Sequence, residues 1–173
     1  MPRFLSPHFT LDELVLSQTA ARRGIDNTPS PEILRHLRRL ADVLEQVRHV
    51  LDDGPVLVSS GYRCAALNRA VGGARNSAHL DGLAADLTAP TFGTVMQVAR
   101  AIASSAIEYD QVIHEYGTWV HLGLARRDRE PRRQQLSVFR GTGYLTGIIG
   151  HQARLAARGC RRAGRRSRRW SPV

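Results

Sequence analysis

The sequence of 173 residues predicts a single α+β domain followed by a basic tail. Two stretches have helical periodicity, whereas the apolar segments are short and do not alternate regularly with helices. Regular alternation would have indicated a parallel α/β sheet, so a small, mainly antiparallel sheet flanked by helices is expected. The chain is long enough for one hydrophobic core and hardly long enough for two.

The predicted helices have clear start signals. Thr10 is a suitable N-cap ahead of two acidic residues, and Ser30 followed by Pro31 is typical of the beginning of a second helix. After Pro31, apolar residues recur at three- and four-residue spacing as far as Leu51, so a long amphipathic helix is expected to end near Gly54. Two more helices are expected, over residues 65–71 and 92–107.

The predicted strands are short and apolar. They are expected over residues 56–59 (a buried strand), 83–87, 111–115 and 119–124, with a last strand around 136–139. The strands 111–115 and 119–124 form a hairpin around Gly117 and Thr118. If these two residues make a tight two-residue turn, His121 pairs with His114; a wider loop or a bulge shifts the register and brings Glu115 to the face of His121.

The positive charge is concentrated at the C-terminal end. All 25 basic residues are arginine, against 15 acidic residues, and the net charge is +10. Eight of the arginines lie within residues 151–173, which contain no acidic residue, so residues 1–150 carry 17 arginines and are close to neutral. We divide the chain into a domain of residues 1–150 and an Arg-rich, disordered tail of residues 151–173.

Two interpretations of this tail stay open. It binds anionic polymers of a bacterial envelope, or it is a solvated extension without a role of its own. Its single aromatic residue, Trp170, provides no array for stacking bases, so no specific nucleic-acid partner is expected.

Residues 1–16 lack a basic segment followed by an apolar one, so no signal peptide is expected and synthesis in the cytoplasm follows. The two cysteines, Cys64 and Cys160, are too few for a disulfide framework, and both are expected to be free thiols. No apolar run reaches the length of a membrane span. A monomer is expected.

Three side chains are candidate metal ligands. His79 lies in a polar loop, and Gly82 after it permits a tight turn toward the next strand. Asp86 and His121 lie in apolar strands, where an unpaired carboxylate is costly to bury. Two imidazoles and one carboxylate form a ligand set that leaves a zinc ion one open position. Taken singly, each of the three residues has an ordinary structural role as the alternative; a buried histidine, for example, can simply be hydrogen-bonded to a backbone carbonyl.

The order of several motifs resembles that of the M15 zinc peptidases, over roughly residues 4–145. More narrowly, it is similar to the D-alanyl-D-alanine carboxypeptidase-like subfamily common in bacteriophages and prophages. The motifs are Phe9-Thr10-Leu11-x-Glu13-Leu14, Ser59-x-Gly61-Tyr62-Arg63, Leu67-Asn68-x-x-Val71-Gly72-Gly73, Ser77-x-His79-x-x-Gly82-x-Ala84-x-Asp86 and Trp119-Val120-His121.

The resemblance implies a Hedgehog/DD-peptidase-like fold in which His79, Asp86 and His121 bind one zinc ion. It also implies an acidic residue, or in some branches a histidine, ahead of the last zinc ligand as the general base. Glu115 is favoured for this role, and His114 is the alternative.

Arg63, by resemblance, contacts the substrate carboxylate or the developing oxyanion. Its ordinary alternative is a surface salt bridge. Tyr62 is expected to line the same pocket.

The implied function is zinc-dependent hydrolysis of peptide bonds in the peptide stems of peptidoglycan, by a D-Ala-D-Ala carboxypeptidase or a wall endopeptidase. A phage or prophage enzyme of this kind acts as an endolysin after holin-type release, or as part of a virion. The alternative is a non-catalytic wall-binding or virion module that keeps the fold.

Overall fold

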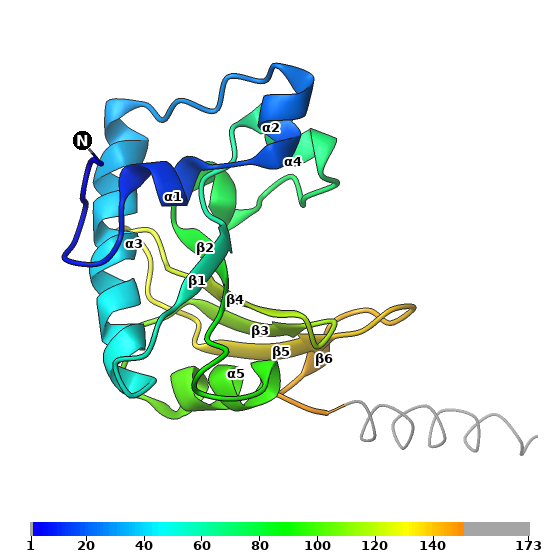
Figure 1. Ribbon diagram of the computed structural model, residues 1–173. Helices are drawn as coiled ribbons and strands as arrows, with labels where there is room; N and C mark the ends of the chain where they lie inside the picture. The colour runs from blue at the N-terminus through cyan, green and yellow to red at the C-terminus, as the bar shows by residue number, and fades with distance from the viewer. Residues whose placement is uncertain (1, 151–173) are drawn as a thin grey trace, which may run out of the picture.

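The computed structural model describes residues 2–150 of the protein (Figure 1). The predictions for the Arg-rich tail of residues 151–173 and for Cys160 lie outside the described residues. Within the described part, no helix has the length and apolarity needed to cross a membrane. The helices are α1 (Leu11–Val15), α2 (Gln18–Arg23), α3 (Pro31–Val50), α4 (Ala65–Ala70) and α5 (Val95–Ser104), with a short 3-10 helix η1 (Ala78–Asp81). The strands are β1 (Leu57–Ser60), β2 (Ala84–Thr88), β3 (Gln111–Glu115), β4 (Trp119–Gly123), β5 (Gln134–Val138) and β6 (Leu145–Thr146).

The six strands form one sheet in the order β1-β2-β4-β3-β5-β6. All neighbours are antiparallel except β3 and β5, which are parallel. The parallel pair is possible because a long connection separates β5 from the β3–β4 hairpin. The predicted α+β class with a mainly antiparallel sheet is confirmed.

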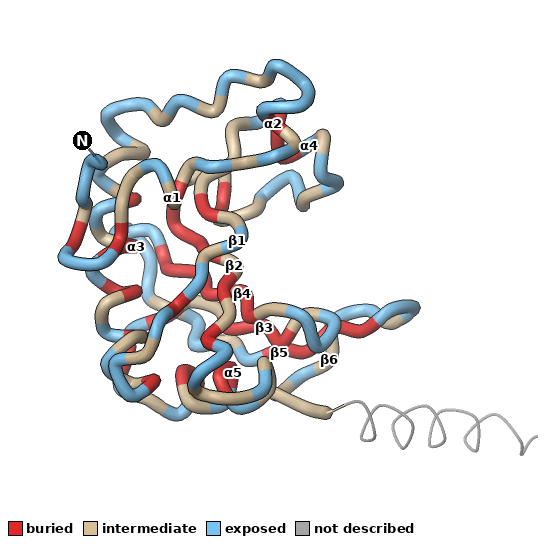
Figure 2. The backbone as a smooth tube through the Cα atoms, in the orientation of Figure 1, coloured by how far each residue is buried: buried red, intermediate tan, exposed pale blue. Residues whose placement is uncertain are grey.

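The helices α3 and α5 cover one face of the sheet. Ser30 caps α3 by accepting a hydrogen bond from the Ile33 backbone, and Pro31 occupies the first turn, as predicted. The apolar stripe of α3 is buried against the sheet, as the red segments in Figure 2 show. The core beneath it joins fully buried residues of α3, α5, β2, β3 and β4, among them Leu40, Leu44, Leu87, Ile102, Val112 and Leu122.

Three parts of the fold differ from the prediction. The expected buried strand 56–59 is β1, which lies at the edge of the sheet with alternating exposed and half-buried residues. The helix α2 was not predicted; Ser17 caps its start and Gly24, at φ 61°, ends it. The short strand β6 was not predicted either; it extends the sheet beyond β5.

The β3–β4 loop contains three residues, so a tight two-residue turn is the wrong prediction. Glu115 pairs with Trp119, His114 with Val120 and Ile113 with His121. Tyr116 and Gly117 both have positive φ, 55° and 71°, which the loop needs in order to reverse the chain in three residues. This is the wider loop that the sequence left open.

Candidate metal centre

Two of the candidate ligands lie in one row across the sheet. Asp86 on β2 pairs with His121 on β4, which pairs with Ile113 on β3. Directly paired residues point to the same face, and this face is opposite to the one that α3 and α5 cover. Because the packed core fixes the far side of β2 and β4, the two side chains project from a rigid platform.

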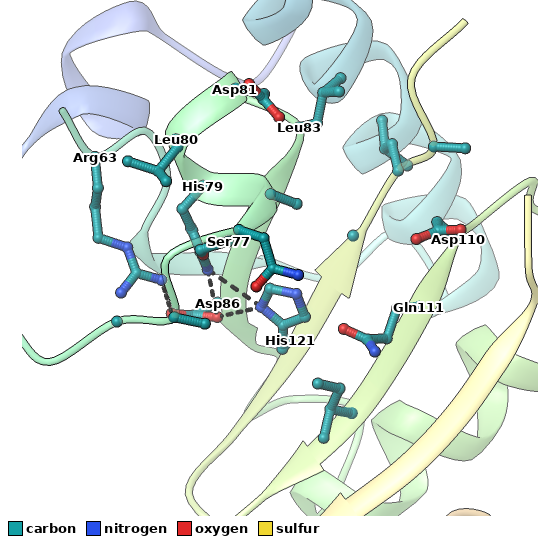
Figure 3. Close-up of a pocket in the computed structure, with 18 of the residues that line it drawn as sticks. Arg63, Ser77, His79, Leu80, Asp81, Leu83, Asp86, Asp110, Gln111 and His121 are labelled. Atoms are coloured by element: carbon teal, nitrogen blue, oxygen red, sulfur yellow. Dashed lines mark hydrogen bonds and ion pairs between the residues drawn. The ribbon is translucent and has the colours of Figure 1, made fainter. Parts of the chain in front are cut away.

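His79 meets these two residues from η1, which precedes β2 (Figure 3). Its Nε2 lies 3.1 Å from Asp86 Oδ1 and 3.2 Å from His121 Nδ1. His121 Nδ1 lies 2.9 Å from the same carboxylate oxygen. The three atoms therefore form a small triangle, and this is the group of side chains within the described residues that could hold a metal ion.

The size and chemistry of this triangle fit zinc. Zinc–nitrogen and zinc–oxygen bonds of about 2.0–2.1 Å keep the ligand atoms of a tetrahedral ion about 3.3 Å apart. The observed separations of 2.9–3.2 Å are close to this value. Three protein ligands, two of them imidazoles, leave the fourth position of such an ion open.

The ring of His79 is oriented by the backbone. Its Nδ1 lies 2.6 Å from the carbonyl oxygen of Gly61, which accepts the ring N–H and leaves the Nε2 lone pair facing Asp86 and His121. Gly82 ends η1 at φ 65°, and its amide donates to the His79 carbonyl at 3.3 Å. A side chain at Gly82 would also come within 3.0 Å of Ile33, so two constraints require glycine there.

The position of the Gly61 carbonyl depends on a close approach to α1. A Cβ at Gly61 would collide with the backbone of Leu14, so only glycine lets the two segments touch. The Tyr62 amide donates to the Leu14 carbonyl at 2.8 Å and fixes this contact. The N-terminal helix thus supports the metal centre through the backbone.

Gly123 provides space for the other imidazole. It lies two residues beyond His121 on β4 and on the same face. A Cβ there would lie 3.3 Å from His121 Nε2, tighter than a normal contact. The glycine therefore lets the His121 ring lie over β4 with its Nδ1 toward Asp86.

Burial and pairing set the charge state of the ligands. Burial lowers the pKa of His79, which is 1% exposed, so its imidazole is neutral and able to bind a metal. Burial alone would raise the pKa of Asp86, but the favourable interactions of the carboxylate with the His79 and His121 rings outweigh burial and hold that pKa below its ordinary value. A neutral imidazole beside an ionised carboxylate is the form in which these groups coordinate zinc.

Arg63 lies beside this triangle. Its Nη2 is 3.5 Å from Asp86 Oδ2, and its amide donates to the His79 carbonyl at 3.1 Å. Burial lowers the pKa of Arg63, while Asp86 and Glu115 raise it, and a guanidinium stays charged at neutral pH. The buried Nε has no hydrogen-bond partner within residues 2–150, and the partly exposed remainder of the guanidinium lines the cleft.

Glu115 shares the face of His121 because of the three-residue loop. It is the diagonal neighbour of His121, at a Cβ separation of about 7–8 Å in such a ladder. The indole N–H of Trp119 donates to Glu115 Oε2 at 3.1 Å and holds the carboxylate. Burial, and the charge of Asp86, raise the pKa of Glu115, although His121, Trp119 and Arg63 act in the opposite direction.

Two sequence candidates lie elsewhere. His114 projects from the opposite face of β3, where its ring makes an edge contact with Phe139, so it does not reach the metal ligands. Tyr62 packs against the main core and does not line the cleft, contrary to the expectation. For His114, the alternation of side chains along β3 decides the direction.

Asn27 is a residue that sequence reasoning missed. Its side-chain amide donates to the carbonyls of Val15 and Tyr62 at 2.9 and 3.0 Å, and its Oδ1 accepts from the Cys64 amide at 2.8 Å. These bonds hold the peptide groups on both sides of Arg63. A single asparagine in a loop of ordinary turn composition gives no signal of such a role.

The metal centre lies in a cleft of about 940 Å³. One end is lined by Tyr116, Trp119 and Tyr144, and the other by charged residues including Arg126 and Arg129. Gln111 and Asp110 continue the row of side chains along β3 away from the ligands (Figure 3). The cleft thus extends along the strands on both sides of the metal ligands.

A paired-histidine and carboxylate centre with a buried arginine and a carboxylate in one cleft defines a zinc hydrolase of the peptidase type. A family model described as Peptidase M15 matches residues 7–123, two thirds of the chain. The chain belongs to the M15 peptidase family. This confirms the resemblance seen in the motifs.

The chain is also similar to the zinc D-Ala-D-Ala carboxypeptidase of Streptomyces albus G. The two are 44% identical over 59 residues, which is 33% of this chain and 23% of that enzyme. The chain thus matches about a quarter of the length of that relative. Together with the donor set, this similarity supports zinc as the metal.

Proposed function

We propose that the protein is a zinc-dependent peptidase that hydrolyses peptide bonds in the stems of peptidoglycan, with His79, Asp86 and His121 as the zinc ligands. The observation that carries the proposal is the convergence of these three donor atoms to 2.9–3.2 Å on the open face of the sheet. The substrate class is supported by the similarity to an enzyme that acts on D-Ala-D-Ala.

The residues around the ligands carry out the proton transfers and bind the substrate. When bound, zinc polarises a peptide carbonyl and lowers the pKa of a water molecule toward neutrality. Glu115 accepts the proton of the attacking water at a carboxylate oxygen, with Trp119 holding the other side of the group, and passes it to the leaving amine. Its raised pKa makes the second transfer easier.

Arg63 binds an anionic oxygen of the substrate. Its side chain lines the cleft, with Nη2 beside Asp86 Oδ2, and its main chain is fixed by the amide bond to the His79 carbonyl. The planar donor fork suits a carboxylate or a developing oxyanion. A preorganised donor of this kind costs no reorganisation during the reaction.

The decisive experiment is digestion of purified peptidoglycan, with mass analysis of the fragments and quantitation of bound zinc. One zinc ion per chain is expected, together with stem peptides shortened by released D-alanine (carboxypeptidase) or with new amino termini from an internal cut (endopeptidase). The Glu115→Gln variant is the matched control, because it keeps all three ligands. Stoichiometric zinc without fragments from any wall type would instead support a non-catalytic wall-binding or virion module.

We further propose that the enzyme acts on the wall after holin-type release from the cytoplasm, as an endolysin of phage or prophage origin. The support is the family's wall substrate and the Arg-rich segment 151–173, which suits an anionic envelope. Expression with a holin should lyse host cells, and expression of the protein alone should not. Lysis that is independent of the holin would contradict this route.

A further inference from the structure

Exposed apolar side chains gather at the cleft. Six large hydrophobic residues are well exposed in the described part of the chain, and three of them, Val71, Tyr116 and Tyr144, line the cleft. Single exposed apolar residues need no explanation, but a group around one site indicates a surface that a ligand covers.

Tyr144 is the most exposed of the three, at 64%. It lies just before β6 in the turn after β5, beyond the residue where the family match ends. At this exposure, the ring and the hydroxyl of Tyr144 are accessible to a ligand. Partial burial, followed by the charge of Glu115, raises the pKa of Tyr144, which is consistent with a position near that carboxylate.

The strand before Tyr144 supplies an apolar floor beside Glu115. Val138 on β5 pairs with Glu115, and Leu136 pairs with Ile113, so their side chains are on the face of the metal ligands. Leu136, Val138 and Ile113 form a second buried cluster, separate from the main core. Beyond this buried floor, Tyr144 lines the cleft together with Tyr116 and Trp119, and these three aromatic rings form a wall along one end of the cleft.

We propose that this wall, with Tyr144 at its rim, binds the part of a peptide substrate that extends beyond the two residues flanking the cleaved bond. The ring packs on small apolar side chains such as alanine methyl groups, and the hydroxyl donates to a peptide carbonyl. The inference rests on the proposed function, since it names which part of the stem the same site holds.

The test compares a short and a long ligand. Binding of N-acetyl-D-Ala-D-Ala and of a pentapeptide stem ending in D-Ala-D-Ala is measured by calorimetry on the zinc-loaded full chain with Glu115→Gln, which prevents turnover. Tyr144→Ala should weaken pentapeptide binding roughly tenfold and change dipeptide binding less than about twofold. Tyr144→Phe should recover most of the loss. Phe4→Ala removes an aromatic ring of similar exposure outside the cleft and should change neither.

In parallel, peptidoglycan is digested with the protein that retains Glu115, and the fragments are analysed by mass. Equal losses for both ligands, or no loss for the pentapeptide, overturn the role of Tyr144 even when the wall is cleaved. Selective loss for the pentapeptide without any wall fragments upholds the binding wall and overturns the peptidase. If neither ligand binds and no fragments appear, both proposals fail.

Discussion

The Asn27→Ala substitution should separate the metal centre from the residue that binds substrate. It removes three hydrogen bonds of 2.8–3.0 Å, two to carbonyls and one from an amide. At about 0.5–1.5 kcal/mol for each bond, the free energy of unfolding should fall by about 2–4 kcal/mol. Zinc content should not change, because none of the three bonds involves a ligand.

Catalysis should suffer because the lost bonds flank Arg63. A displacement of about 1 Å costs up to roughly a hundredfold in rate, so kcat/KM should fall about 10–100-fold. The assay is a double-mutant cycle with Arg63→Ala, at a temperature where all variants are folded. In the Arg63→Ala background, Asn27→Ala should reduce kcat/KM by less than about twofold. Thr28→Ala, an exposed neighbour, is the matched control.

The reasoning is refuted if Asn27→Ala lowers kcat/KM by the same factor in the wild-type protein and in the Arg63→Ala variant. That result would mean that Asn27 supports the fold in general, with no special connection to Arg63. A loss of zinc in Asn27→Ala would point instead to the Gly61 carbonyl, which accepts the His79 ring N–H in the same loop.

Three further predictions concern the site. Glu115→Gln should keep zinc but lower kcat by roughly 10²–10⁴-fold, and an unchanged rate in this variant would contradict the assignment. Because the base must be ionised, the rate of the wild-type enzyme should fall as the pH is lowered, and the fall should begin above the ordinary glutamate pKa. His79→Ala and Asp86→Ala should each lose stoichiometric zinc in metal analysis, and retention of zinc by either would remove it from the ligand set. Gly61→Ala should destabilise the fold by more than about 2 kcal/mol in urea unfolding, because its Cβ meets the Leu14 backbone; a stable, zinc-loaded variant would show that the loop can move.

The sequence predicted the helices and strands whose apolar residues recur at a regular spacing or form short runs. Residues 31–50 bury a helical stripe, and the strands around Asp86 and His121 follow from short apolar runs. The sequence also indicated the three candidate ligands, two of them because titratable groups in apolar strands need a partner. Their convergence depends on long-range pairing of β2 with β4, which no local pattern encodes.

The features that escaped prediction depend on single backbone conformations or tertiary contacts. Whether Glu115 or His114 faces the metal ligands depends on one extra loop residue, and the positive φ of Tyr116 that permits it is unusual for a tyrosine. The edge position of β1 could not be read from its composition, because a half-exposed strand can still be rich in valine and leucine. Asn27 acts through hydrogen bonds to backbone groups distant in sequence.

The site therefore combines two kinds of support, and they should respond differently to change. Asp86 and His121 lie on central strands with the packed core directly beneath them, so metal binding depends on the whole fold. Arg63 and Glu115 are placed by a hydrogen-bonded loop and a three-residue turn, whose local changes leave the core intact. Substitutions in the β3–β4 turn should alter turnover while zinc stays bound, whereas changes at Gly61 should also disturb the orientation of His79.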